Sequence, residues 1–156
     1  MESVTFEKLT GNAHKPRLEA FLRLSDTWTE PALSYRVVLL EFAEKILLNG
    51  HAILAVSADA RDVGLAAFYC NDDIRHRAYL THLAVEPAYR SRGLGRALLD
   101  QARKHCSSVG MTSMQLEVYL SNEAAIRFYV SCGFVKSHAE GVNLNLPNSI
   151  CMGCSL

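Results

Sequence analysis

The sequence predicts an α/β domain in which a mixed sheet carries helices on both of its faces. Segments with the two-residue alternation of strands are interleaved with segments whose apolar residues recur at helical spacing. Along the chain these segments follow the order β-α-α-β-β-β-α-β-α-β-β, which favours one sheet covered by helices. No repeat or interdomain linker interrupts this order, and a chain of 156 residues can bury one real core. We therefore expect residues 1–156 to form a single domain.

The first half of the chain is expected to contain three strands and two helices. The three strands lie at residues 4–9, 51–57 and 63–70, and the polar residues 58–62 join the last two as a hairpin. The first helix spans residues 15–24. The second is expected to run from an N-cap at Ser34 to a stop at Asn49-Gly50. The loop between the two helices contains the only tryptophan, Trp28.

The second half of the chain is expected to alternate strands and helices. Strands are predicted at residues 78–85, 113–118, 134–138 and 150–156, and helices at residues 94–109 and from Ser121 or Asn122 to Cys132. Gly133 follows the second of these helices, where a left-handed C-cap belongs.

Composition excludes several classes of partner. Sixteen basic and sixteen acidic side chains cancel, so no global field attracts nucleic acid or an anionic membrane. The apolar stretches are too short to span a bilayer, and residues 1–4 resemble no signal peptide. The five cysteines are scattered, and the pair Cys151 and Cys154 lacks the second pair that a structural metal site needs. We expect a cytoplasmic protein with reduced thiols and no metal, nucleic acid or membrane partner.

The glycine-rich turn at residues 90–97, which joins the strand at residues 78–85 to the helix at residues 94–109, is the first candidate binding site. It follows a strand and opens a helix, so backbone N–H groups at the positive end of the helix dipole face any bound anion. Gly93 and Gly95 permit a close backbone approach. The spacing fits neither the dinucleotide fingerprint nor a Walker A loop. The residues expected to cradle a phosphate are Arg90, Ser91, Arg92, Gly93, Leu94, Gly95, Arg96 and Ala97.

This turn has the form Arg-x-x-Gly-x-Gly and resembles the pyrophosphate loop of the GNAT superfamily of acetyl-CoA-dependent N-acetyltransferases. A second stretch, Leu116 to Phe134, resembles the acetyl-CoA segment of the same enzymes, and in particular the bacterial enzymes that acetylate the N-terminal alanine of a ribosomal protein. The resemblance covers residues 78–135 in matching order. The first half of the chain matches only in its order of elements.

The resemblance implies a fold and a set of roles. The sheet would be mostly antiparallel and splayed between its fourth and fifth strands. The backbone around Leu83, Ala84 and Val85 would pair with the pantetheine arm of acetyl-CoA. Asn122 would contact the coenzyme, and Tyr129 would lie near its sulfur.

The chemistry of acetyl transfer favours Tyr129 as general acid. The amine must attack as its neutral form, and at a pKa near ~10.4 only about one molecule in ~2,500 is neutral at pH 7, a cost of roughly 4–5 kcal/mol. A base or a desolvating pocket offsets this cost. The leaving thiolate needs a proton, which a phenol can donate. The alternative is that Tyr129 only belongs to the apolar face of its helix, beside Phe128.

Two residues are candidates for the base. Glu117 occupies the position of the catalytic glutamate in the ribosomal alanine acetyltransferases, although a solvated carboxylate on a strand explains it equally well. His82 lies in the preceding strand and could act through water, since histidine titrates near neutral pH. A structural histidine is the alternative. Water itself is a third possible base.

The acceptor is expected to lie against the loop before the second helix. There Asp26 or Glu30 would attract a cation, and Trp28 and Tyr35 would form apolar walls; an ordinary connector explains these residues as well. The first functional hypothesis is acetylation of a small-molecule amine, namely an amino sugar, an amino acid or a polyamine. The alternatives are acetylation of a protein N-terminus and a non-catalytic module that binds acyl-CoA. An exposed strand at residues 150–156 could pair across a homodimer or close the sheet.

Overall fold

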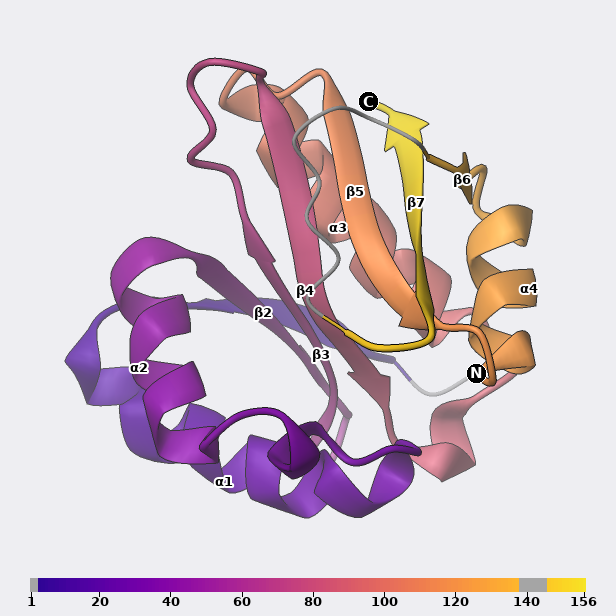
Figure 1. Ribbon diagram of the computed structural model, residues 1–156. Coiled ribbons are helices and arrows are strands. Elements are labelled where there is room, and N and C mark those ends of the chain that lie inside the picture. Colours follow the sequence, from indigo (N-terminus) through magenta and orange to yellow (C-terminus); the bar gives the residue numbers. More distant parts are fainter. Residues whose placement is uncertain (1–2, 138–145) are drawn as a thin grey trace.

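The computed structural model describes residues 3–137 and 146–156 and contains one seven-stranded sheet with the strand order β1-β2-β3-β4-β5-β7-β6 (Figure 1). Only β4 and β5 run parallel; the other neighbouring strands are antiparallel. The mixed α/β prediction is therefore confirmed. The strands are β1 Thr5–Leu9, β2 His51–Val56, β3 Asp62–Tyr69, β4 Arg77–Val85, β5 Ser113–Tyr119, β6 Val135–Lys136 and β7 Ser149–Ser155. The α-helices are α1 Lys15–Ser25, α2 Leu39–Asn49, α3 Leu94–Ser108 and α4 Glu123–Ser131.

The helices cover both faces of the sheet. In Figure 1, α1 and α2 lie on one face and α3 lies on the other, while α4 stands beside β5 and β7. Each face has its own apolar core. Phe21, Phe42 and Ile46 are buried between the sheet and the first two helices, whereas Leu98 and Phe134 are buried on the α3 face. The two cores hold the sheet rigidly between them.

The sheet opens between β4 and β5. These strands pair only where residues 77–79 lie beside residues 113–115, and they separate beyond Tyr79. A V-shaped opening follows, with the second half of β4 on one side and the second half of β5 on the other. The splay predicted between the fourth and fifth strands is confirmed.

A β-bulge in β4 changes the direction of its side chains at this opening. Leu80 pairs with Phe68 and His82 pairs with Ala67, so Thr81 is an extra residue without a partner in that ladder. As a result Leu80 and Leu83 both pack on the α3 face, although they are three residues apart. The bulge thereby directs His82 to the α2 face.

Two elements differ in their bounds from the sequence-based expectation. The second helix begins at Leu39 rather than near Ser34, because Ser34 caps no helix. Its amide and hydroxyl instead donate hydrogen bonds of 2.9 and 2.6 Å to the carboxylate of Asp26. Of the strand expected at residues 134–138, residue 138 lies outside the described residues, and among the other four only Val135–Lys136 form β6.

The C-terminal strand is not an exposed edge. It lies between β5 and β6, so both of its sides are paired at residues 152–153. Pairing of this strand across a dimer is therefore wrong for that segment, and it closes the sheet instead. Residues 138–145, between β6 and β7, lie outside the described residues. Among the helices of the described residues, none has the length and apolar character of a membrane span.

Candidate active site

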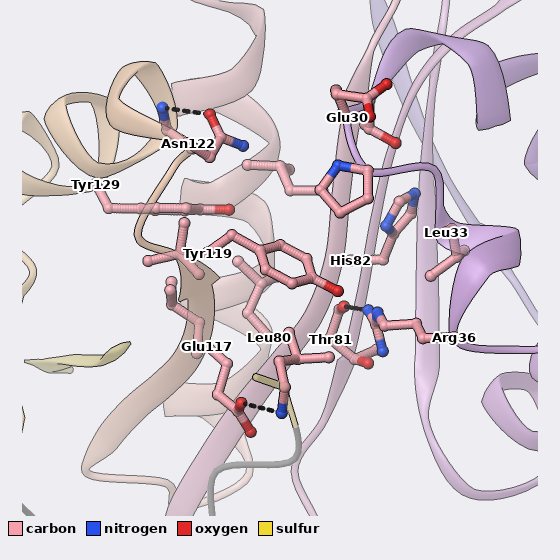
Figure 2. Close-up of a pocket in the computed structure, with 17 residues that line it drawn as sticks. Glu30, Leu33, Arg36, Leu80, Thr81, His82, Glu117, Tyr119, Asn122 and Tyr129 are labelled. Carbon is pink, nitrogen blue, oxygen red and sulfur yellow. Dashed lines mark hydrogen bonds between the residues drawn. The ribbon is translucent and has the colours of Figure 1, made fainter. Parts of the chain in front are cut away.

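A small cavity of about 140 Å³ lies in the opening between β4 and β5. Figure 2 shows that side chains from both halves of the sheet, from α4 and from the segment before α2 point into it. The lining residues are Thr29, Glu30, Pro31, Leu33, Arg36, Leu80, Thr81, His82, Leu83, Leu116, Glu117, Val118, Tyr119, Asn122, Ala125, Tyr129 and Leu146. The cavity brings together Glu30, His82, Glu117, Asn122 and Tyr129, which the sequence predicted as site residues.

The glycine-rich turn has the backbone of an anion site. Ser91 and Gly93 adopt left-handed conformations, with φ of +62° and +82°. Gly93 is the N-cap of α3 and no side chain caps the helix, so the N–H groups of its first turn remain open to a ligand. A Cβ on Gly95 would lie 3.3 Å from Cζ of Phe128, so this glycine also permits close packing of α3 against α4. These features fit a pyrophosphate at this turn.

The three arginines of the turn hold it in place. Arg90 donates hydrogen bonds to the carbonyls of Val85, at 3.2 Å, and Trp28, at 2.7 Å. Arg96 donates to the carbonyl of Ser131 at 3.0 Å. The guanidinium of Arg92 lies 5.6 Å from the ring centroid of Tyr89. Their side chains brace the loop against its neighbours, and their charges make its surroundings positive.

The second half of β4 offers a free backbone edge to the opening. Leu83, Ala84 and Val85 pair with β3 on one side, but on the other side the described residues of β5 pair with β4 only as far as Tyr79. Leu83 lines the cavity, whereas the side chain of Ala84 is buried in the core under α1 and α2. An extended ligand arm can add to this edge in the way that a strand does.

Asn122 and Tyr129 reach the cavity from α4. Asn122 is the N-cap of this helix, and its Oδ1 accepts a hydrogen bond of 3.2 Å from the amide of Ala125. Its Nδ2 is thereby turned toward the cavity (Figure 2). Burial, with a smaller contribution from Cys132, raises the pKa of Tyr129 well above its usual value. The phenol therefore keeps its proton throughout the neutral range and can donate it.

Glu117 lies on the cavity wall but is engaged by the segment that leads into β7. Its carboxylate accepts hydrogen bonds from the amide of Leu146, at 3.1 Å, and the hydroxyl of Ser149, at 3.2 Å. Burial, followed by the charge of Glu117, raises the pKa of Tyr79 to about 12, and the phenol of Tyr79 forms a hydrogen bond with this carboxylate. These contacts fix the position of the candidate base.

His82 faces the cavity from β4 and packs edge-on against Phe42, with 6.2 Å between ring centroids. Burial, and then the charge of Arg36, lower its pKa to about 4, and Asp26 opposes them. His82 is therefore neutral at physiological pH and holds a proton only weakly. It can accept a hydrogen bond from water or an amine, but it is a weak base.

The expected acceptor residues separate in space. Glu30 lines the cavity. Trp28 instead packs edge-on against Phe21, with ring centroids 5.6 Å apart, and lines a separate groove beside α1 and Pro87. Tyr35 is 81% exposed and lines neither of these two cavities. The connector interpretation fits Trp28 and Tyr35, because the turn before α2 directs their side chains away from β4.

Sequence reasoning missed Arg36 and Tyr119. The guanidinium of Arg36 donates a hydrogen bond of 3.2 Å to the carbonyl of Thr81, the extra residue of the bulge. Arg36 falls inside the helix expected from Ser34, but that helix begins three residues later, at Leu39. Tyr119 lies two residues after Glu117, so strand alternation alone places it on the same face. The hydroxyls of Tyr119 and Tyr129 both point toward β4 (Figure 2).

Comparison with known proteins gives consistent matches. The model of the acetyltransferase (GNAT) family matches residues 16–134. The [ribosomal protein bS18]-alanine N-acetyltransferase of Salmonella typhimurium is 40% identical over 109 residues, which cover 62% of this chain and 72% of that enzyme.

Solved structures agree in fold. A GNAT-family acetyltransferase from Staphylococcus aureus has a TM-score of 0.78 at 16% identity and covers 98% of this chain and 99% of its own. The PaiA N-acetyltransferase of Thermoplasma acidophilum, solved with coenzyme A, has a TM-score of 0.74 at 22% identity and covers 99% of both chains.

Proposed function

The chain belongs to the GNAT family of acetyltransferases and is an acetyl-CoA-dependent N-acetyltransferase, and we propose that its acceptor is the α-amino group of a peptide N-terminus. Because the chain is an enzyme, the hypothesis of a non-catalytic module that binds acyl-CoA is rejected. The observation that carries the proposal is the pair of opposite charges, Glu30 and Arg36, on the acceptor side of the cavity.

This charge pair matches an α-amine better than the other amines considered. In a peptide N-terminus the ammonium group lies two bonds from a carbonyl carbon, so a cation and a hydrogen-bond acceptor approach together. Glu30 attracts the ammonium group and Arg36 donates to the carbonyl oxygen. A polyamine carries only cations and is repelled by Arg36. An amino sugar offers neutral hydroxyls that make no use of that charge.

The similarity to the Salmonella enzyme supports the same class. That enzyme is named for the alanine of ribosomal protein bS18, and the family model that matches residues 16–134 spans Glu117, Asn122 and Tyr129. A peptide α-amine is the acceptor that such a relative would lead one to expect.

The candidate bases also favour an α-amine. An α-amino group has a pKa near ~8, so roughly one molecule in ten is neutral at pH 7, against about one in ~2,500 for a lysine-like amine. A site whose histidine has a pKa of about 4 and whose carboxylate is held by two hydrogen bonds contributes modestly to deprotonation. An acceptor amine of low pKa needs little more help from the site to lose its proton.

The proposed reaction is direct attack. Acetyl-CoA supplies the activated thioester. The neutral amine nitrogen bonds to the carbonyl carbon as the carbon–sulfur bond breaks, and Tyr129 donates its phenolic proton to the leaving sulfur. The proton that the nitrogen loses passes to Glu117 or to water, and solvent returns a proton to Tyr129.

A panel of acceptors tests the proposal through release of coenzyme A. It contains short peptides beginning with alanine, serine or glycine, the same peptides blocked at the N-terminus but carrying lysine, free amino acids, polyamines and amino sugars. We expect the highest kcat/KM for a peptide with a free N-terminus and no turnover of its blocked form. Highest activity on a polyamine or an amino sugar would overturn the proposal.

A free amino acid is the second candidate, because the cavity is small, at about 140 Å³. It shares the α-amine and the neighbouring carbonyl carbon with the peptide. The comparison of alanine, alanine amide and an alanine peptide separates the two candidates: the peptide must exceed both small molecules in kcat/KM for the N-terminal function to stand.

A further inference from the structure

Three side chains with metal-binding atoms meet on the α3 face of the sheet, in a part of the molecule that the reaction does not use. His51 begins β2, Cys70 directly follows β3, and His105 lies near the end of α3. One nitrogen or sulfur atom from each lies within 4.8 Å of the others. We propose that His51, Cys70 and His105 bind a divalent cation of the zinc class.

The donor set identifies the class of cation. A thiolate with two imidazoles is a soft and borderline set that suits Zn²⁺ and disfavours Mg²⁺ or Ca²⁺, which prefer oxygen. In a tetrahedral zinc site, ligand atoms lie ~3.3–3.6 Å apart, as follows from bond lengths of about 2.0–2.3 Å. The separations here are at most 4.8 Å, so they exceed this range by no more than about 1.5 Å, which small rotamer changes close. All three side chains are partly exposed, so a cation can enter.

The two imidazoles already face each other. The ring centroids of His51 and His105 are 4.4 Å apart, and the planes are tilted by 50°. Phe68 packs against both rings, with centroid distances of 5.4 and 5.7 Å, and limits their movement. Three ligands held in this way leave a fourth position for water.

Cys70 supplies the only thiolate. Its thiol forms a hydrogen bond with the thiol of Cys106, which is fully buried in the core next to His105 in sequence. Binding replaces the proton of Cys70 with the cation, so one proton passes to solvent for each cation bound. Cys106 stays in the core as the neighbour that orients the sulfur.

Lys8 already occupies one lone pair of the cluster. This exposed residue of β1 places its ammonium group 3.0 Å from Nδ1 of His105, where it donates a hydrogen bond to the ring. A metal ion and this ammonium compete for the same lone pair. The long side chain can swing into solvent when the cation binds.

The site lies far from the acetyl-transfer chemistry. His105 is eleven residues beyond Leu94 along α3, which corresponds to ~16 Å along the helix axis. The three ligands come from β2, β3 and α3. A bound cation therefore ties the end of this helix to the sheet, and binding to the folded state alone raises stability.

The test uses the reduced, metal-free full chain titrated with Co²⁺, whose bond to a thiolate gives a charge-transfer absorption, followed by displacement with Zn²⁺. We expect one equivalent of metal with the thiolate band, and a Tm raised by Zn²⁺. The substitutions Cys70→Ser, His51→Gln and His105→Gln should each weaken binding at least tenfold. Cys154→Ser, which removes a partly buried thiol outside the cluster, should bind like the parent chain.

A fourth variant tests the competition. Lys8→Gln removes the ammonium and should bind Co²⁺ at least threefold more tightly. Circular dichroism establishes whether each variant is folded. If Cys70→Ser does not fold, the two histidine variants carry the test. The proposal is overturned if the reduced chain, with all five thiols titratable, binds no Co²⁺ through sulfur. Loss of the band in Cys154→Ser but not in Cys70→Ser, or weaker binding by Lys8→Gln, overturns it as well.

Discussion

Tyr129 is one of two phenols that point into the cavity, and its replacement by phenylalanine gives the first prediction. The Tyr129→Phe variant lacks the proton that the leaving sulfur needs, so kcat should fall about 10- to 100-fold, toward the lower end of general acid effects. The Kd for acetyl-CoA should change less than about threefold, because the phenyl ring and its packing against Phe134 remain. Steady-state kinetics and calorimetry measure the two quantities.

Tyr35 supplies the matched control, since it is a tyrosine outside the cavity. Tyr35→Phe should have parental kinetics. If Tyr119→Phe lost activity and Tyr129→Phe kept it, the proton donor would be Tyr119.

Arg36 gives the second prediction, which depends on the proposed acceptor. In Arg36→Gln the positive charge is gone, and a hydrogen bond to a charged donor contributes about 1.5–3 kcal/mol, so KM for a peptide acceptor should rise about tenfold or more. The reaction step is untouched, and kcat should stay within about threefold. Arg127→Gln is the control, because Arg127 lies on the solvent side of α4, 3.9 Å from Glu123. An unchanged KM in Arg36→Gln would remove Arg36 from acceptor binding.

The residues that sequence reasoning misplaced show where local patterns stop being informative. Ser34 has the chemistry of an N-cap, but Asp26, eight residues earlier, accepts its hydrogen bonds. Tyr35 lies next to Ser34 in a short 3₁₀ turn, and its side chain is exposed. In such connectors a distant carboxylate decides the backbone path, and no periodicity reports on that contact.

At the scale of elements, the start of α3 gives the third prediction. Gly93 and Gly110 both have positive φ, of +82° and +91°, and a Cβ on either would meet no atom within 4 Å. Alanine at each position therefore costs the same backbone strain, about 1–2 kcal/mol. Only Gly93 lies in the anion turn, so Gly93→Ala should weaken acetyl-CoA binding about five- to tenfold, whereas Gly110→Ala should not. Equal binding by the two variants would contradict a phosphate site at this turn.

The contact between β5 and the start of β7 gives the fourth prediction. Glu117→Gln removes the carboxylate, and Ser149→Ala removes only one hydrogen-bond donor to it. If Glu117 accepts the amine proton, kcat should fall about tenfold or more in Glu117→Gln and less than about threefold in Ser149→Ala. Similar small losses of activity with similar losses of stability would show that Glu117 only anchors β7. Urea unfolding alongside the kinetics separates these results.

The helices α3 and α4 are the elements that sequence analysis predicted best. Each begins with its own signal, a left-handed Gly93 for α3 and the capping side chain of Asn122 for α4. Each signal acts within a few residues, so the local sequence is enough to recognise it. The bulge at Thr81 has no such signal, because it depends on the register of β3 against β4.

For the molecule as a whole, His82 gives the fifth prediction. Its pKa in the folded chain is about 4, against about 6.5 when unfolded, so between these values the unfolded chain binds a proton that the folded chain does not. Unfolding free energy should therefore decrease as the pH falls from about 6.5 to about 4, by about 3 kcal/mol in all, and this component is constant outside that range. His82→Gln should make the dependence less steep in urea unfolding between pH 7 and pH 4.5, while the component of His51, whose pKa burial also lowers to about 4, remains.

The control for this prediction is His76→Asn, which replaces an exposed histidine outside the cavity. It should keep the slope of the parent chain. A parental slope in His82→Gln would assign the loss of stability at acidic pH to other groups.

The cavity and the proposed metal site both depend on the whole fold. The cavity combines the segment before α2 with β4, β5, α4 and Leu146. The metal site combines His51, Cys70 and His105, which no short motif connects. Sequence analysis identified the residues that carry family patterns, such as Tyr129. It could not identify Arg36 or the histidine cluster, because their proximity arises only when separate parts of the sheet and its helices pack.

Because β7 lies at the C-terminal end of the chain, the contacts around Glu117 can form only late in synthesis. Residues 90–97 leave the ribosome well before residues 146–155. A nascent chain can therefore form the glycine-rich turn while β5 still lacks its neighbour β7. Glu117 gains its hydrogen bonds from Leu146 and Ser149 only when β7 inserts between β5 and β6. If Glu117 is the proton acceptor of the reaction, a partly synthesised or clipped chain that ends before residue 146 would lack the two hydrogen bonds that hold it, and full activity would require translation past this strand.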